Sequence, residues 1–473
     1  MNYKQVAFSH FTSVGLPINR ESEYFIFLAY DTSFDWALCS QLSLDLKRLG
    51  MKVNVVDISR ESSSLPRRLV KRIKKTPPPI SVKCRALLEG SQIPIINLKR
   101  GSLRRSHALA QEVVSESDFD LKSGYGKLVY PTLVDTFKSL KVTKFTKQRI
   151  IEEISNVLDV EQRMDRWLTD DNFHHIVVNG RISRYRAVRL KLERITASLY
   201  YLEIGATPNH YQLFSRPPQS ELENHRQARA LWDLAPPDKI VQAKNYFQTR
   251  RTFDPNLSIS WSSRMVPGFI PTIDKRKKVC TFYSSSQIEF VEEIDLRQEN
   301  DFLDQGDALF QLLSILPKDE WQVFLRKHPN RPDSGYFDEE NEIWALSREC
   351  ENLKVIEQDS KVDSFALARA SDLIVNFGTS FGAECIYWGL GPVLNLRPTF
   401  WTPFVSENSP RNKTQLVALF QRPEITKSLP EAILPWGYYC AIRGIELKDF
   451  LWNSTNGWSV RNKDEKIQGI FSD

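Results

Sequence analysis

The chain has 473 residues, is 41% hydrophobic, 11% aromatic and 26% charged, and carries a formal net charge of +6. This length suits two domains of about 150–250 residues each, and the composition excludes disordered and fibrous classes of protein. No apolar run approaches the ~20 residues that span a bilayer and the N-terminus lacks the apolar stretch of a secretory signal, so we expect a soluble, cytoplasmic or at most peripheral protein.

The first half of the chain alternates short apolar runs with helical patterns. We expect strands at Tyr24–Ala29, Lys52–Asp57, Ile93–Leu98, His175–Val178 and Leu199–Leu202, and helices at Trp36–Leu49, Lys147–Trp167 and Tyr185–Ile195. The rhythm is less regular than in the second half, but it indicates a first α/β domain.

The second half shows the same alternation more clearly. We expect strands at Lys278–Tyr283, Trp321–Arg326, Leu353–Glu357, Asp372–Phe377 and Pro392–Leu396, and helices at Ser364–Ala370 and Phe381–Trp388. Such alternation predicts a parallel, doubly wound sheet. The fold class is therefore α/β with two Rossmann-like domains. We expect residues 1–265 to form the first domain, 266–405 the second, and 406–473 to complete the second and to return to the first.

Two basic clusters lie in the first half, within Arg67–Lys75 and Lys99–Arg105. They are either a solvated face or a surface that attracts anionic lipid or an anionic acceptor. Nucleic acid is not expected as a partner, because no recognition module accompanies the charges.

Three turns follow strands of the predicted second sheet, at the edge where doubly wound folds bind ligands. The first is Ser284-Ser285-Ser286, the second includes Arg326, His328 and Pro329, and the third runs through Gly378, Thr379 and Ser380 to Glu384. Each alone is explained by ordinary capping or turn chemistry. Together they offer hydroxyls, cations and backbone N–H groups to a phosphate, with Glu384 within reach of a ribose.

These motifs carry a resemblance. The run from Arg326-x-His328-Pro329 through Thr379-Ser380-x-x-Ala383-Glu384 to Gly389-x-Gly391-Pro392 resembles the capsular polysaccharide biosynthesis family, which includes transferases of 3-deoxy-manno-octulosonic acid (Kdo). It is more distantly similar to bacterial sialyltransferases, whose corresponding turns hold a CMP-sugar. The resemblance implies a GT-B glycosyltransferase with two Rossmann-like domains facing each other across a cleft. It implies that His328, Thr379 and Ser380 contact the donor nucleotide.

The same family has an Asn-Gly-Arg turn and a Glu-x-Gly turn, which Asn179-Gly180-Arg181 and Glu203-Ile204-Gly205 resemble. Because Glu203 follows a predicted strand and lies beside two tyrosines, we expect it at a strand end, facing the cleft, with a pKa raised by burial. It either orients the following loop or pairs with Arg181, or it is the first candidate for the carboxylate that takes the acceptor's proton. Asp31 and Asp35, which follow the strand Tyr24–Ala29, are the alternatives.

The implied partners are a nucleotide-sugar, as substrate, and a glycan or glycolipid of capsule or lipopolysaccharide. No cofactor or metal is expected, since the six cysteines are scattered without ligand spacing and no Asp-x-Asp signature is present. Three alternatives stay open: a CDP-glycerol-type glycerophosphotransferase, a non-catalytic glycan-binding protein of polysaccharide export, and a nucleotide-sugar epimerase.

Overall fold

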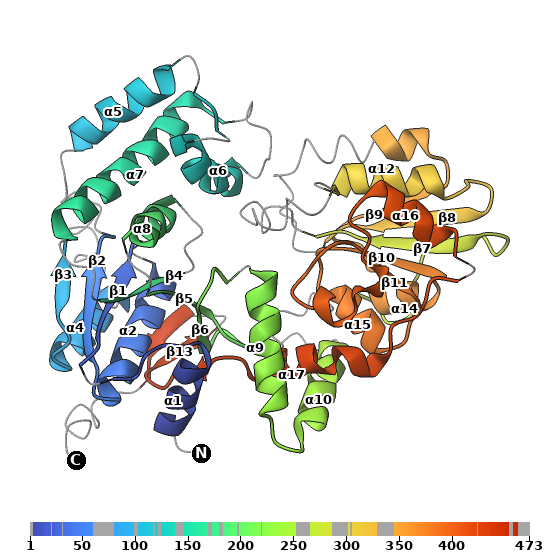
Figure 1. The fold of residues 1–473 in the computed structure, drawn as a ribbon. Helices are drawn as coiled ribbons and strands as arrows, with labels where there is room; N and C mark the ends of the chain where they lie inside the picture. Colours follow the sequence, from blue (N-terminus) through green and yellow to red (C-terminus); the bar gives the residue numbers. More distant parts are fainter. Residues whose placement is uncertain are drawn as a thin grey trace. The chain divides into compact units, whose positions relative to one another are not determined.

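A computed structural model describes residues 3–19, 21–30, 32–59, 80–98, 103–116, 119–121, 124–137, 145–168, 173–178, 183–195, 198–218, 220–251, 265–285, 301–302, 305–328, 345–422, 424–453 and 457–461. The chain divides into two compact units (Figure 1). Unit 1 comprises Met1–Leu133, Phe145–Pro218 and Ile442–Asp473, and unit 2 comprises Val134–Lys144 and Gln219–Ala441.

Unit 1 is built on a seven-stranded sheet with the order β12-β6-β5-β4-β1-β2-β3. Its strands are β1 (Glu23–Leu28), β2 (Lys52–Asp57), β3 (Ile95–Asn97), β4 (His174–Val178), β5 (Leu199–Ile204), β6 (His210–Phe214) and β12 (Ile445–Glu446). The first five are parallel, whereas β6 and β12 are antiparallel additions at one edge. The parallel strands follow the spatial order 3-2-1-4-5 of a Rossmann-like sheet.

Helices pack against both faces of this sheet (Figure 1). The helices of unit 1 are α1 (Tyr3–Ser13), α2 (Ser33–Arg48), α4 (Ile80–Gly90), α5 (Leu103–Ser115), α6 (Gly124–Phe137), α7 (Lys147–Trp167) and α8 (Ser183–Glu193). Of these, α5 packs on α7 rather than on the sheet (Figure 1). On one face, alternate residues Phe25 and Phe27 of β1 meet Trp167 of α7 edge-on. The period-2 side-chain alternation of a strand thus supplies two apolar faces, one for each helix layer.

Unit 2 contains a five-stranded, wholly parallel sheet with the order β11-β10-β7-β8-β9. Its strands are β7 (Lys278–Tyr283), β8 (Trp321–Arg326), β9 (Leu353–Ile356), β10 (Leu373–Phe377) and β11 (Val393–Arg397). Numbered within the unit, this is again the order 3-2-1-4-5. The predicted fold class, two Rossmann-like α/β domains, is confirmed.

The helices of unit 2 show that the predicted domain boundary was placed too late in the chain. They are α9 (Glu221–Asp233), α10 (Lys239–Arg251), α12 (Gln305–Ile315), α14 (Ser364–Arg369), α15 (Phe381–Tyr387), α16 (Lys413–Phe420) and α17 (Leu434–Ile442), with 3-10 turns at Thr402–Phe404, Ser406–Asn408 and Pro430–Ile433. Ala228 of α9 and Phe247 of α10 are fully buried in the same core as Trp401 and Tyr439. Because they share that core, α9 and α10 belong to unit 2, which begins at Gln219 rather than after residue 265.

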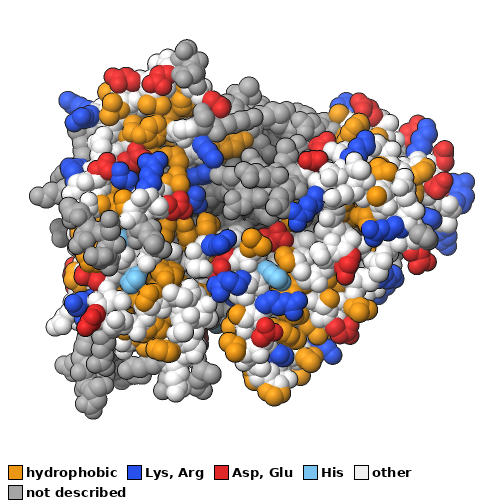
Figure 2. All heavy atoms as spheres, viewed as in Figure 1, with side chains coloured by type: hydrophobic (Ala, Val, Ile, Leu, Met, Phe, Trp, Pro, Cys, Tyr) orange, Lys and Arg blue, Asp and Glu red, His pale blue; other side chains and the backbone are white. Residues whose placement is uncertain are grey.

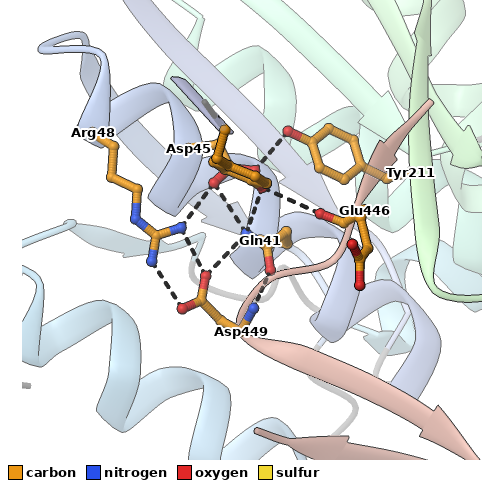
Figure 3. Close-up of polar contacts among 7 residues, drawn as sticks. Gln41, Asp45, Arg48, Tyr211, Glu446 and Asp449 are labelled. Carbon is orange, nitrogen blue, oxygen red and sulfur yellow. Dashed lines mark hydrogen bonds and ion pairs between the residues drawn. The ribbon is translucent and has the colours of Figure 1, made fainter. Parts of the chain in front are cut away.

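The C-terminal segment leaves unit 2 at the end of α17 and belongs to unit 1 from Ile442 onward. Residues of this segment form β12 and the hairpin β13 (Phe450–Asn453) and β14 (Gly457–Val460). Figure 3 shows its attachment: Arg48 of α2 bonds both carboxylate oxygens of Asp449 at 2.8 Å and one of Asp45 at 2.9 Å. Tyr211 of β6 donates to the other oxygen of Asp45 at 2.7 Å. A shared, buried polar cluster therefore joins the last strands to the first helices.

Candidate functional site

Three turns of unit 2 meet at the carboxyl ends of neighbouring strands. Ser284 and Ser285 follow β7, Lys327 and His328 follow β8, and the run from Gly378 follows β10. Since β10, β7 and β8 are adjacent and parallel, their carboxyl ends share one edge of the sheet. The sheet thus brings together three segments that are far apart in the sequence.

Hydrogen bonds tie the three turns to one another. The Ser284 hydroxyl accepts from the His328 backbone N–H at 2.8 Å, which joins the first turn to the second. The Ser285 hydroxyl donates to the Gly378 carbonyl at 3.1 Å, which joins the first to the third. Gly378 has φ +71°, a left-handed conformation that favours glycine, so the chain can turn sharply there. The edge of the sheet is in this way fixed by its own side chains.

The first residue of α12 also holds the first turn in place. The Gln305 amide accepts from the Ser285 N–H at 2.7 Å and donates to the Ser285 carbonyl at 2.9 Å. Trp401 plays a similar part for the third turn, because its indole N–H donates to the Thr379 carbonyl at 3.2 Å. Both residues are buried. Ser284, Thr379 and Ser380 line a pocket beside these turns. The Thr379 hydroxyl also accepts from the Phe381 N–H at 3.1 Å.

That pocket is open to solvent, has a cavity volume of about 100 Å³ and lies wholly within unit 2. One part of its wall is polar and cationic, and another is apolar. Its lining consists of Arg250, Met265, Tyr283, Ser284, Arg326, Lys327, His328, Ser364, Phe365, Thr379, Ser380, Phe381 and Glu384. Phe381 contacts the rings of Tyr283 and Phe365, with centroids 4.5 and 5.0 Å apart.

The cationic side of the pocket is partly compensated by neighbouring groups. The buried Lys327 ammonium pairs with the Glu357 carboxylate at 2.8 Å. Arg326 donates to the backbone carbonyls of Glu357 and Ser360, and burial lowers its pKa. The guanidinium of Arg326 therefore also braces the loop after β9, a role that the sequence did not indicate.

Of the predicted donor-site residues, Ser284, Arg326, His328, Thr379, Ser380 and Glu384 line the pocket. Ser285 and Gly378 are not part of the lining, and the hydrogen bond between them connects two of the turns. Ser286 and Pro329 fall outside the described residues.

Glu384 lines the pocket, and it is paired with a half-buried arginine that the sequence patterns do not indicate. Its side chain is 5% exposed, and its carboxylate accepts from Nε of Arg250 at 3.0 Å. Arg250 lies 134 positions earlier, in α10, and no local motif marks it. No sequence pattern indicates this residue, and none indicates Met265, which also lines the pocket. Only the packing of α10 against α15 reveals that Arg250 belongs to the pocket.

Glu203 lies at the end of a strand, as predicted, but the strand is longer than expected. It is the penultimate residue of β5, because β6 pairs antiparallel with β5 and extends the strand to Ile204. Its carboxylate accepts from the Ile204 N–H at 2.8 Å, and the side chain is half-buried. The two neighbouring tyrosines bond elsewhere, Tyr200 to the Gly15 carbonyl and Tyr201 to Glu193.

Asp35 occupies the first turn of α2, whereas Asp31 lies outside the described residues. The Asp35 side chain is buried, and the Thr32 hydroxyl caps the helix by accepting from the Asp35 N–H at 3.0 Å. Burial raises the pKa of Asp35 to about 7, and the nearby charge of Glu203 adds to the rise. The structure therefore brings two of the three candidate carboxylates into one electrostatic environment.

The basic clusters are described only in part. The segment Arg67–Lys75 lies outside the described residues, as do Lys99 and Arg100. Arg104 and Arg105 are exposed on α5. In the view of Figure 2, cationic and anionic side chains are interspersed over the surface of the described residues.

Within the described residues, no helix is both long and apolar enough to cross a membrane. The same part of the chain holds no group of three His, Cys, Asp or Glu side chains arranged for a metal ion.

Two Rossmann-like units in one chain, one of them with a pocket at the carboxyl edge of its sheet, define a protein of the GT-B fold class. No protein-family model matches the chain, and no curated protein matches it in sequence.

Several solved structures are similar at low identity. The KpsC beta Kdo 2,4 transferase of Thermosulfurimonas dismutans is 14% identical over 56% of this chain and 78% of its own, with a TM-score of 0.36. The UDP-GlcNAc 2-epimerase of Methanocaldococcus jannaschii, solved with UDP-GlcNAc and UDP, is 10% identical over 87% and 97%, with a TM-score of 0.27. The SsfS6 glycosyltransferase of Streptomyces sp. SF2575 is 12% identical over 88% and 96%, with a TM-score of 0.23. Similarities of this size do not define an activity.

Proposed function

We propose that this chain is a GT-B glycosyltransferase that binds a nucleotide-sugar in the pocket of unit 2 and transfers the sugar to a glycan or glycolipid. The observation that carries the proposal is the convergence of His328, the hydroxyls of Ser284, Thr379 and Ser380, and buried cations on one pocket. Such groups suit the phosphates of a nucleotide, whose charge grows as the sugar leaves. The pocket's apolar wall suits the rest of a nucleotide.

In the proposed reaction, an acceptor hydroxyl attacks the anomeric carbon and forms the new glycosidic bond. The bond between that carbon and the phosphate oxygen breaks, and the electron pair leaves with the nucleotide. His328 and the hydroxyl groups of the first and third turns offset the charge that develops on the phosphate. The acceptor's proton passes to a carboxylate, for which Asp35 is the candidate that we favour because burial raises its pKa to about 7.

We further propose Kdo or a related acidic sugar, carried by CMP, as the donor, and a capsule or lipopolysaccharide chain as the acceptor. The support for these finer assignments is the motif run from Arg326 to Pro392. The localisation proposed with them is the cytoplasm or the inner face of the cytoplasmic membrane. No cofactor or metal takes part in the proposed reaction, and the nucleotide-sugar enters as a substrate.

The first test is a thermal-shift screen with CMP, UDP, GDP and ADP. A nucleotide that binds the folded state alone raises the melting temperature in proportion to the logarithm of its concentration. We expect CMP to give the largest rise. If none of the four nucleotides shifts the melting temperature at millimolar concentration, the proposed function is wrong.

His328→Ala tests the pocket itself. The variant should bind the nucleotide more weakly by about 1.5–3 kcal/mol, the range for a hydrogen bond to a charged group. His225→Ala is the matched control, because His225 lies in the same unit, on α9, and packs against Phe404 outside the pocket. Calorimetry should show normal affinity for the control, and equal losses in both variants would contradict the assignment.

The competing functions separate by product. A transferase releases CMP from a CMP-sugar much faster when an acceptor is present. An epimerase would convert the donor without an acceptor, a glycerophosphotransferase would release CMP from CDP-glycerol, and a glycan-binding protein would turn over neither.

A further inference from the structure

We infer that Arg250 is a positioning residue that keeps the Glu384 carboxylate ionised and fixed in the pocket wall, where it accepts hydrogen bonds from the hydroxyls of a bound ribose. The inference rests on the proposed function, since it concerns the nucleotide that the pocket would hold. It assigns a role to α10, an element that carries none of the motifs of the site.

The two side chains form a buried pair. Nε of Arg250 lies 3.0 Å from Oε1 of Glu384, and their side chains are 26% and 5% exposed. Both line the pocket. A carboxylate that is so deeply buried needs a partner charge, because its removal from water is costly.

Packing holds Arg250 in this place. One turn before it on α10, Phe247 is fully buried and stacks on Tyr387 of α15, with ring centroids 4.4 Å apart and planes at 14°. Gly437 of α17 has no side chain, and an added Cβ would lie 2.3 Å from the Phe247 ring. The helix that bears Arg250 is thus fixed against the helix that bears Glu384, and the pair is preorganised without a ligand.

Arg250 is the cation that opposes the effect of burial on Glu384. Burial raises the pKa of the Glu384 carboxyl, and Arg250 lowers it. Among the described residues, Tyr246 of α10 and Cys385 of α15 also titrate near the pair, with Cys440 of α17 beside Tyr246. The same pocket is also lined by Arg326, Lys327 and His328. Burial raises the pKa of both Tyr246 and Cys385 well above the ordinary value, so neither carries charge at neutral pH.

Ionisation matters for the ligand because a carboxylate accepts hydrogen bonds at both oxygens, whereas a carboxylic acid gives up part of that capacity. Since Nε of Arg250 bonds Oε1, we assign Oε2 to the two neighbouring hydroxyls of a ribose. Without Arg250, burial would favour the protonated form, and the pocket would lose this acceptor first at low pH.

The experiment compares Arg250→Met, Glu384→Gln and the double variant, with the tightest binder among CMP, UDP, GDP and ADP as the probe, by calorimetry at pH 7 and pH 9. Arg226→Met is the matched control. Arg226 pairs with the buried Glu223 at 2.8 Å in the same unit but away from the pocket.

We expect Arg250→Met to weaken binding about tenfold at pH 7 and less at pH 9, where more of Glu384 is ionised. Glu384→Gln should weaken binding to a similar extent at both pH values. The double variant should bind no more weakly than Glu384→Gln, because the arginine acts through the carboxylate. A double variant tenfold weaker than Glu384→Gln would overturn the inference, since Arg250 would then contact the nucleotide itself.

Melting temperatures without a nucleotide test the ionisation separately. In Arg250→Met the pKa of Glu384 in the folded protein lies further above its value in the unfolded chain. The contribution of this residue to stability is therefore greatest at low pH, where Glu384 is protonated, and it falls as pH rises. Adding Glu384→Gln should therefore raise the melting temperature of Arg250→Met more at pH 9 than at pH 6, by about 5 °C or more. A rescue that is equal at both pH values would overturn the inference.

These outcomes distinguish the two proposals. If no nucleotide binds the unmodified protein but the rescue depends on pH, the proposed function fails and the ionising role of Arg250 stands. If a nucleotide binds but the double variant loses further affinity, the function stands and the role of Arg250 fails. Should Arg250→Met not fold, Arg250→Lys keeps the charge but shortens the reach, and it should show the same pH dependence in weaker form.

Discussion

Burial shifts the pKa of several side chains in unit 1. Asp35 is the one among them for which we propose a chemical role. Burial raises its pKa to about 7, so the carboxylate form is lost as pH falls below that value. If Asp35 accepts the acceptor's proton, kcat/KM should fall on the acidic side of about pH 7. Asp35→Asn should lower turnover on the order of 100-fold or more and leave nucleotide binding unchanged.

Glu203→Gln is the comparison for this prediction. If Glu203 only raises the pKa of Asp35, its removal changes the pH dependence of kcat/KM more than it changes the maximum rate. We therefore expect Glu203→Gln to shift the acidic limb to lower pH while retaining turnover at neutral pH. A 100-fold loss in Glu203→Gln with near-normal turnover in Asp35→Asn would reverse the two assignments.

His175 makes the stability of unit 1 depend on pH. Its side chain is fully buried between the rings of Phe25 and Phe27, and within the described residues neither ring nitrogen has a hydrogen-bond partner. Burial lowers its pKa to about 4. The unfolded chain takes up the proton at about pH 6.5, so stability is present above that value and falls between about pH 6.5 and 4, by roughly 3 kcal/mol in total.

Urea unfolding at pH 7 and pH 4.5 measures this effect. In His175→Leu the acid loss should shrink, although His10, whose pKa burial also lowers to about 4, should keep part of it. His107→Leu is the control, because His107 is exposed on α5. An acid loss of the same size in His175→Leu and in the unmodified protein would show that His175 does not cause it.

At the scale of elements, the third turn depends on how closely α15 approaches Trp401. A Cβ added to Gly382 would lie 2.6 Å from Cζ2 of Trp401 and 2.9 Å from Cγ of Asn376. Gly382→Ala should therefore displace the indole that donates to the Thr379 carbonyl. We expect a loss of about 1–3 kcal/mol in unfolding free energy, as in other overpacked cores, and weaker nucleotide binding.

Gly391→Ala is the matched control for this change. The nearest atoms to an added Cβ there are 3.4 and 3.5 Å away, which is close to ordinary contact. Denaturant unfolding followed by nucleotide titration compares the two variants. Equal stability of both variants would mean that α15 can move away from Trp401 without cost.

At the scale of the whole molecule, the chain closes unit 1 with its own C-terminal segment. Arg48 bridges the fully buried Asp45 and the carboxylate of Asp449, 401 positions apart from it. Burial raises the pKa of Asp45 to about 6, while Tyr3, Tyr211 and Arg48 oppose that rise. Removing the cation leaves a buried carboxylate without its charge partner.

Arg48→Met should therefore cost about 3 kcal/mol of unfolding free energy and expose residues 442–461 to limited proteolysis. Arg461→Met removes an ion pair of the same segment, with Glu446, in which the side chains are 37% and 60% exposed. That control should cost less than about 1 kcal/mol, as surface pairs do. Cleavage at the same rate in both variants would show that the Arg48 cluster does not hold the segment.

The sequence by itself determined the parallel core of the protein. Buried parallel strands are short, continuous apolar runs between helical patterns, so β7 and β8 could be predicted to the residue, and so could α7. The three turns of the pocket could be predicted as well, because the carboxyl ends of parallel strands share an edge. Those inferences need only local pattern and one rule of topology.

Only the tertiary structure decided the features that depend on long-range contact. Pairing with the antiparallel strand β6 extends β5 beyond the predicted end at Leu202 to Ile204, and burial in a common core places α9 and α10 in unit 2. Arg250 forms its ion pair with Glu384, a residue 134 positions later in the sequence. These contacts cannot be predicted from the spacing of apolar residues. That spacing indicates which face of a helix or strand is buried, but not which other element packs against it.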